Sequence, residues 1–278
     1  MTVRVVTDSA CDLPDDLVAT LGITIVPLTI RFGDKEFVDR EELSVDDFWQ
    51  RLTTSSALPE TAAPSAGAFE ARFRALVDDG ATGILCVNLS SRLSATMQAA
   101  TVAAKAVAED CPIEVIDSLT CSMGLGNLCL VAGRLAQDGA DLESIVAEVT
   151  DRRDRTKLFG TLDTLEFLKR GGRIGNARAL LGSMLSIKPV VTVADGRVEP
   201  ATKVRTRSKA LQYLLDRVPV GRVEQVSVLH ANAPEVDELL AKLEPLVGDA
   251  EVVVGTIGPV VGVHTGPRTV GLAWIQRA

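Results

Sequence analysis

Three short apolar segments in the first half of the chain each end in a run of polar residues. Residues 3–7, 84–87 and 114–116 have the composition of buried strands, and helical patterns separate them. This alternation predicts an α/β fold whose first part is an open, mostly parallel sheet with helices on both faces. In such sheets ligands bind beyond the carboxyl ends of the strands, so the three polar runs are the predicted mouth of a site.

The polar runs begin at Asp8, Asn88 and Asp117. We interpret Asp8 and Asp117 as residues that organise the loops, because aspartate side chains commonly accept hydrogen bonds from nearby backbone N–H groups.

Capping signals define the other elements of the first half. Asp12 and Pro14 predict the start of a helix that ends near Gly22, and Ser44 with Asp47 resembles a capping box. Residues 23–32 are predicted to be one buried strand, and residues 53–64 a loop. Further helices are predicted at 45–52, 69–77 (capped by Ser65), 94–108 (opened by Ser94), 124–137 and 142–153.

In the second half the order of strand and helix patterns differs from that of the first half, which predicts a mixed α/β domain. Asp195-Gly196 is the strongest short hairpin signal in the chain and predicts a hairpin over 189–203. Strands are expected at 157–160, 225–229, 251–255 and 270–275, helices at 208–218 and 234–246, and a Gly-rich loop at 258–268. The change near Asp154 predicts two domains, 1–154 and 155–278.

Residues 162–190 contain two apolar helical patterns around a double glycine. Gly171 and Gly172 are predicted to end the first helix, because glycine adopts the left-handed conformation found at many helix C-termini. Arg173 then stands in a turn between that helix and a second one over 177–187, which Pro189 ends. A guanidinium held between two buried helices indicates a site that receives an anion.

Composition excludes several classes of function. The 278 residues carry a net charge of −8, which disfavours a nucleic-acid binder. No apolar run is long enough to span a bilayer, and the N-terminus shows no signal peptide. The five cysteines form no C-x-x-C pair, which favours reduced thiols in a cytoplasmic protein.

Cofactor motifs are also missing from the sequence. It contains no Walker A motif and no complete dinucleotide-binding fingerprint. With only two histidines and dispersed cysteines, a zinc site is not expected. We therefore expect no cofactor and no metal on this chain.

Several polar residues are candidates for binding an anion. Ser94 precedes a predicted helix, whose N-terminus attracts negative charge, and Thr61 offers a second hydroxyl upstream. His264 lies between Gly262 and Gly266, where the backbone can approach a ligand closely. Each residue also has a purely structural reading as a cap, a turn residue or a loop histidine.

A basic run in this acidic chain is a candidate docking patch for a negatively charged partner. The run could equally be a solvated helix start. It consists of Lys203, Arg205, Arg207 and Lys209. Cys11 lies near the predicted mouth, but no base is adjacent in the sequence, so a role as nucleophile is disfavoured.

Taken together, these motifs resemble the DegV family, the fatty-acid-binding subunits of bacterial fatty acid kinase. The resemblance runs from end to end. It rests on Thr7-Asp8-Ser9, Asp12-Leu13-Pro14, Thr61 with Pro64-Ser65, Leu93-Ser94, Asp117-Ser118, Leu162-Asp163-Thr164-Leu165, Gly171-Gly172-Arg173, Lys188-Pro189, Lys203-Val204-Arg205-Thr206 and His264-Thr265-Gly266.

The resemblance implies two α/β domains with one long-chain fatty acid in an apolar tunnel near their interface. It implies that Thr61, Ser94 and nearby backbone amides such as that of Ala95 hold the carboxylate, with Arg173 and His264 close by. A separate kinase subunit would supply ATP and magnesium and form an acyl phosphate. Arg173 and the basic run would face the incoming phosphate or that kinase.

Two alternatives stay open at this point. One is a regulatory protein that senses lipid and signals by contact alone. The other is a hydrolase or acyltransferase that uses Ser94 or Cys11. Transient contact of the protein with a membrane surface is a separate expectation.

Overall fold

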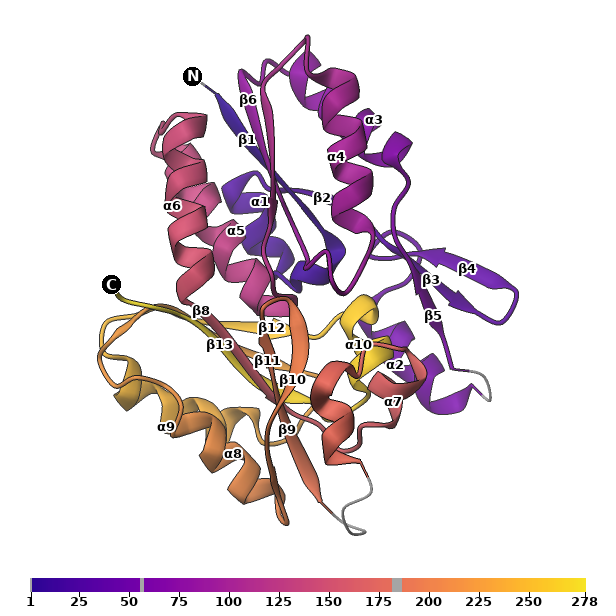
Figure 1. Ribbon diagram of the computed structural model, residues 1–278, viewed down its shortest axis with the longest axis vertical. Coiled ribbons are helices and arrows are strands. Elements are labelled where there is room, and N and C mark those ends of the chain that lie inside the picture. The colour runs from indigo at the N-terminus through magenta and orange to yellow at the C-terminus, as the bar shows by residue number, and fades with distance from the viewer. Residues whose placement is uncertain (1, 56–57, 182–186) are drawn as a thin grey trace.

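The computed structural model describes residues 2–55, 58–181 and 187–278 and contains two main sheets (Figure 1). One is a four-stranded sheet built from the first half of the chain, and the other is a six-stranded sheet built from the second half. A three-stranded sheet lies to one side. The predicted mixed α/β fold is confirmed.

The four-stranded sheet is entirely parallel, with the order β2-β1-β6-β7. The strands are β2 (Thr24–Val26), β1 (Val3–Asp8), β6 (Gly83–Asn88) and β7 (Ile113–Asp117). Neighbouring residues face opposite layers: Val6 packs with Phe69 and Phe73, whereas Val5 packs with Leu125 and its neighbours.

Helices therefore cover both faces of this sheet, as predicted (Figure 1). One layer contains α3 (Ala66–Asp78) and α4 (Thr96–Val107), and the other contains α1 (Asp15–Leu21), α5 (Ser122–Gln137) and α6 (Leu142–Arg155).

The six-stranded sheet is mixed, with only β11 and β12 parallel to each other. Its strands, in spatial order, are β10 (Arg197–Val204), β9 (Lys188–Ala194), β8 (Thr156–Thr161), β13 (Val270–Gln276), β11 (Val223–His230) and β12 (Val252–Thr256). Helices α8 (Arg207–Leu215) and α9 (Val236–Val247) cover one face. The β9–β10 hairpin is confirmed, and both Asp195 and Gly196 have the positive φ that its two-residue turn needs.

Two predictions about residues 23–64 are wrong. Residues 23–32 form two strands in different sheets, because β2 joins the parallel sheet while β3 (Thr29–Phe32) joins the three-stranded sheet. Pro27 separates them, since it has no N–H to donate to a ladder. The predicted loop 53–64 contains β5 (Glu60–Ala62), which pairs with β3. The third strand, β4 (Lys35–Val38), pairs with the other edge of β3, and α2 (Val45–Thr54) begins at its predicted cap, Ser44.

The start of the first helix also differs from the prediction. Asp12 does not cap α1: it has a left-handed φ of 53°, and Pro14 occupies the N-cap position. The Asp12 side chain instead accepts hydrogen bonds from Ser122 and from the Gly258 N–H.

The Gly-rich segment 258–268 is not a loop. Its greater part is the helix α10 (Pro259–Thr265), in which Gly262 makes room for aromatic rings of α2.

The segment around Arg173 holds shorter helices than expected. The first is α7 (Glu166–Arg170), and a 3-10 helix, Gly175–Leu180, follows it. The rest of the helix predicted at 177–187 falls largely outside the described residues. Pro189 lies inside strand β9 rather than at a helix end.

Helix α5 joins the two main sheets. Its Asn127 donates to the carbonyl of Ala273 in β13 and accepts from Ser227 in β11. Strands up to Asp117 and strands from Thr156 onward belong to different sheets. Because α5 packs on both sheets, the boundary near Asp154 stays a prediction.

Candidate functional site

A cavity of about 860 Å³, here called the chamber, lies between the mouth of the parallel sheet, helix α10 and the inner face of the six-stranded sheet. The lining residues are Leu28, Thr61, Leu89, Leu93, Ser94, Cys121, Ser122, Leu158, Gly160, Leu162, Leu168, Arg173, Val191, Thr192, Val193, Val198, Leu229, Ile257, Val260, Val261, His264, Thr265 and Thr269.

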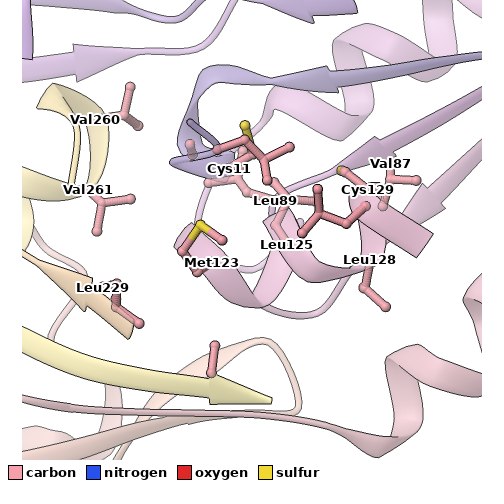
Figure 2. Close-up of a cluster of buried hydrophobic side chains, with 14 of the residues drawn as sticks. Cys11, Val87, Leu89, Met123, Leu125, Leu128, Cys129, Leu229, Val260 and Val261 are labelled. Atoms are coloured by element: carbon pink, nitrogen blue, oxygen red, sulfur yellow. The ribbon is translucent and has the colours of Figure 1, made fainter. Parts of the chain in front are cut away.

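The chamber wall is mostly aliphatic. Figure 2 shows four of its aliphatic lining residues, with Val260 and Val261 of α10 and Leu229 of β11 lying opposite Leu89. Three of the four lining threonines do not alter this character, because their hydroxyls donate to carbonyls within the wall. Thr192 donates to Leu158 at 2.7 Å, Thr265 to Val261 at 3.2 Å, and Thr269 to Thr265 at 3.0 Å.

A second cavity of about 890 Å³, here called the vestibule, shares Thr61, Arg173 and His264 with the chamber. Its remaining lining residues include the charged side chains of Glu60 and Arg170. The full remainder is Leu58, Pro59, Glu60, Phe167, Arg170, Gly171 and Val263. Thr61, Arg173 and His264 therefore lie where an apolar cavity meets a polar one. We call these three residues the junction.

His264 contacts Thr61 at the junction, with 3.2 Å between the ring Nε2 and the hydroxyl. The two residues come from α10 and β5, which are far apart in the sequence. Burial lowers the pKa of His264 to about 4, and the nearby charge of Arg173 adds to this effect. The imidazole is therefore neutral at physiological pH and can act as a hydrogen-bond partner without adding positive charge.

Gly171 and Gly172, which follow α7, have different roles. Gly172 has a φ of 70° and ends the turn after α7, as predicted for the pair. Gly171 has ordinary right-handed geometry, so the left-handed prediction is wrong for it. A Cβ at Gly171 would lie 2.2 Å from Nδ1 of His264. The absent side chain is what lets the imidazole occupy its place.

Arg173 bridges the two halves of the chain at the junction. Its Nε donates to the Leu93 carbonyl at 3.1 Å and its Nη1 to the Gly171 carbonyl at 2.8 Å. Within residues 2–55, 58–181 and 187–278 it forms no ion pair with a carboxylate. Two neutral carbonyls orient the guanidinium and leave its charge available for an anion.

Ser94 lies immediately before α4 and lines the chamber but not the vestibule. Its hydroxyl is 2.8 Å from that of Thr96 and accepts from the Thr96 N–H at 3.3 Å. The N-cap is Ala95 rather than the predicted Ser94. Ala95 itself is exposed and lines neither cavity.

The basic run lies away from both cavities. Lys203, Arg205 and Lys209 are exposed. The Arg207 side chain is only 13% exposed and pairs with Glu235 at 3.3 Å and Asp163 at 4.0 Å. Three of the four residues therefore present charge to solvent, and docking at this run stays a prediction.

Sequence reasoning missed the connection between Asp12 and Ser122. The fully buried Asp12 carboxylate accepts from Ser122, which lines the chamber, and from the Gly258 N–H at 2.9 Å, just before α10. It thus holds two parts of the chamber wall together. Burial raises the pKa of Asp12 to about 7. No local pattern could reveal these contacts, because the partners lie far along the chain.

Three further candidates, Cys11, Asp8 and Asp117, lie outside both cavity linings. Cys11 is buried, lines neither cavity, and has a pKa raised to about 12 by burial. Asp8 and Asp117 organise loops as predicted, since they accept from the N–H groups of Leu89 and Leu119.

The described part of the chain contains neither a candidate metal site nor a candidate membrane span. In the described part of the chain, no three His, Cys, Asp or Glu side chains come together as a metal site would require. No helix there is both long enough and apolar enough to cross a bilayer.

Comparison with known proteins gives one consistent result. The family model described as "uncharacterised protein, DegV family" matches residues 2–277. A DegV domain-containing protein from Streptomyces coelicolor is 37% identical over 281 residues, covering 99% of this chain and 99% of that protein. One from Halalkalibacterium halodurans is 32% identical, covering 98% of each.

Solved structures of fatty-acid-binding relatives share the fold. A DegV family protein from Thermus thermophilus, described for its fatty acid binding, has a TM-score of 0.91 and 34% identity, covering 99% of this chain and 100% of that one. A stearic acid-binding protein from Eubacterium ventriosum has a TM-score of 0.89 and 27% identity, covering 99% and 98%. The likeness extends over the whole length in each case, and the chain belongs to the DegV family.

Proposed function

We propose that this protein binds one long-chain fatty acid, with the hydrocarbon tail in the chamber and the carboxylate at the junction. The observation that carries the proposal is the meeting of an apolar space with a polar one at Thr61, Arg173 and His264. Structural relatives described as fatty-acid-binding proteins support the choice of ligand.

The energetics fit an amphipathic ligand. Burial of each methylene contributes about 0.8 kcal/mol, so a long tail supplies most of the affinity without any polar contact. A buried carboxylate is unfavourable unless it is paired and hydrogen-bonded. Arg173 supplies a positive charge, the Thr61 and Ser94 hydroxyls supply donors, and the neutral imidazole of His264 fixes the Thr61 hydroxyl.

We further propose that the bound carboxylate is presented to a separate kinase subunit through the vestibule. In that step a carboxylate oxygen would attack the terminal phosphorus of ATP, the bond to ADP would break, and an acyl phosphate would form. ATP and magnesium would be held by the partner, in the cytoplasm. The support is positional: the junction residues line both cavities, so a carboxylate held there would also border the vestibule, from which a phosphoryl group could reach it.

A hydrolase or acyltransferase finds less support. The nearest contact of the Ser94 hydroxyl is Thr96, and the ring of His264 bonds Thr61, so Ser94 has no paired base among these contacts. The Cys11 thiol is protonated at neutral pH because burial raises its pKa to about 12.

Native mass spectrometry of the purified protein tests the binding proposal. We expect the mass of the chain plus one fatty acid, and extraction should yield a free acid of unaltered length. Protein that is empty even after incubation with fatty acids, and that cleaves acyl esters, would overturn the proposal in favour of the hydrolase.

The kinase step needs a second assay. The loaded protein is mixed with a candidate kinase subunit and ATP, and acyl phosphate is trapped as the hydroxamate. Formation of hydroxamate only when both proteins are present supports presentation. Binding of the partner without hydroxamate would instead favour the lipid-sensing regulator.

A further inference from the structure

Gly160 occupies a place in the fold where glycine is unfavourable. It lies in β8, between β9 and β13 in the six-stranded sheet, so it is interior to both its strand and its sheet. Glycine weakens a strand there, because it loses more chain entropy than other residues and packs no side chain. Such a glycine calls for a specific reason.

Neither the backbone nor the packing of the wall requires it. Gly160 is not among the residues with positive φ, so any residue could adopt its conformation. A Cβ built on it would meet only one atom within 4 Å, the Val270 carbonyl oxygen at 3.7 Å, which is ordinary contact. Gly271 is different, since a Cβ there would lie 2.6 Å from the Phe159 carbonyl oxygen.

The space in front of Gly160 is the chamber. Side chains alternate along a strand, and Leu158 and Leu162, two residues away on either side, both line the chamber as Gly160 does. Across the sheet, Gly160 is paired with Val191 on one side and with Gly271 on the other, and Gly271 is paired with Leu229. Paired residues share a face.

This row forms a trough across the strands. Val191 and Leu229 line the chamber at the two ends of this row. Gly160 itself lines the chamber, whereas the Leu229 side chain covers Gly271, with its Cγ and Cδ2 3.1 Å from the place of a Cβ there, so the trough is open at Gly160. Of the two, only Gly160 could carry a larger residue without a clash in the wall.

We propose that Gly160 determines which acyl chains this protein accepts, by leaving room for an unbranched hydrocarbon tail to cross strand β8 in contact with its backbone. The inference rests on the proposed fatty-acid function. It assigns to Gly160 a specificity role and no part in holding the carboxylate. The favoured ligand is a chain long enough to pass over Gly160.

A side chain at position 160 would occupy the path of the tail. Methylenes that lie at or beyond the trough would lose their place, and each lost methylene weakens binding about fourfold. Acids too short to reach the trough would bind as before. The predicted signature is therefore a change in the dependence of affinity on chain length.

The test uses the variants Gly160→Ala, Gly160→Val and Gly160→Leu in the full-length chain. Delipidated proteins are titrated with octanoic, dodecanoic and octadecanoic acid. The matched control is Gly83→Ala at the start of β6, a strand interior to its own sheet, where the added Cβ would meet Leu142 at 3.4 Å and the residue does not line the chamber. Thermal unfolding checks that each variant is folded, and Gly160→Ala carries the test if the larger variants are not.

We expect octadecanoic acid to bind progressively more weakly from Ala to Val to Leu, by roughly tenfold or more for Leu, with octanoic acid little changed. Equal weakening for all three acids, or no change for any, would overturn the role of Gly160 while wild-type binding still supports the fatty-acid function. Absence of binding to the wild-type protein would overturn both.

Discussion

The chamber and the vestibule share Thr61, Arg173 and His264, yet they are built in different ways. The chamber draws aliphatic side chains from both halves of the chain, each contributing a small area. The vestibule draws on a few short stretches and is lined by charged residues. Under the proposed function, affinity for a tail would be spread over many residues, whereas selection of a carboxylate would depend on very few.

This difference predicts where single substitutions matter. A substitution in the aliphatic wall should produce a graded effect, whereas loss of a polar group at the junction should change which head group is accepted. Substitutions around each cavity test this difference.

The largest expected effect concerns Asp12, which lies behind the chamber wall. Burial raises its pKa from the ordinary aspartate value of 3.8 to about 7 in the folded protein. The folded protein therefore keeps a proton that the unfolded chain releases, and stability is lost as pH rises between these two values. For Asp12→Asn, which cannot titrate, stability relative to wild type should rise over this window by on the order of 4 kcal/mol.

Denaturant unfolding of both proteins at several pH values measures this difference. Asp8 and Asp39, whose pKa values burial raises to about 6, are present in both proteins and largely cancel. A stability difference that stays constant across the window would show that Asp12 is ionised throughout.

The next largest effect is expected at Arg173. Hydrogen bonds to charged groups contribute about 1.5–3 kcal/mol, so Arg173→Gln should weaken fatty acid binding roughly tenfold to hundredfold. Binding of the corresponding fatty alcohol should change little. Arg170→Gln is the matched control, because Arg170 also lines the vestibule but is paired with Glu166. Calorimetric titration measures the affinity for acid and alcohol. An equal loss of affinity for both ligands would contradict the assignment.

A smaller effect is expected from the two hydroxyls. Neutral hydrogen bonds contribute about 0.5–1.5 kcal/mol each, so Thr61→Ala with Ser94→Ala should weaken retention of the acid by around tenfold. Lipid retained through purification, quantified by mass spectrometry, gives the answer. Unchanged retention would mean that the carboxylate lies elsewhere.

The smallest effect is expected in the pH dependence of fatty acid affinity. Because the pKa of His264 is lowered to about 4, its imidazole takes up no proton between about pH 6.5 and 8. Its stability contribution is lost only as pH falls from 6.5 toward 4, where the unfolded chain is protonated first. Fatty acid affinity should vary less than about twofold over the higher range, and a steep rise toward pH 6.5 would indicate a charged histidine.

Local signals were sufficient for much of the fold. Asp195-Gly196 predicted its hairpin, Ser44 its helix, and the three polar strand ends the edge of the parallel sheet. Each is a signal within a few residues, and local chemistry decides it.

Packing between distant segments accounts for the errors. Residues 258–268 looked like a loop because they are rich in glycine, but Gly262 is helical. A Cβ there would lie 2.6 Å from the ring of Phe48, so the glycine serves the contact between α10 and α2. Gly171 similarly serves His264 rather than its own backbone.

The candidate site was predictable only in part. The sequence could propose Thr61, Ser94, Arg173 and His264 individually, but their grouping follows from β5 and α10 meeting beside the turn after α7. The contacts of Asp12 had no local signal at all.

A crystal structure of the protein with a bound long-chain fatty acid tests the central claim most directly. We predict the carboxylate within hydrogen-bonding distance of Thr61 and Arg173, with the tail running through the chamber over Gly160. A fatty acid bound with its carboxylate away from the junction, or lying outside the chamber, would contradict the account.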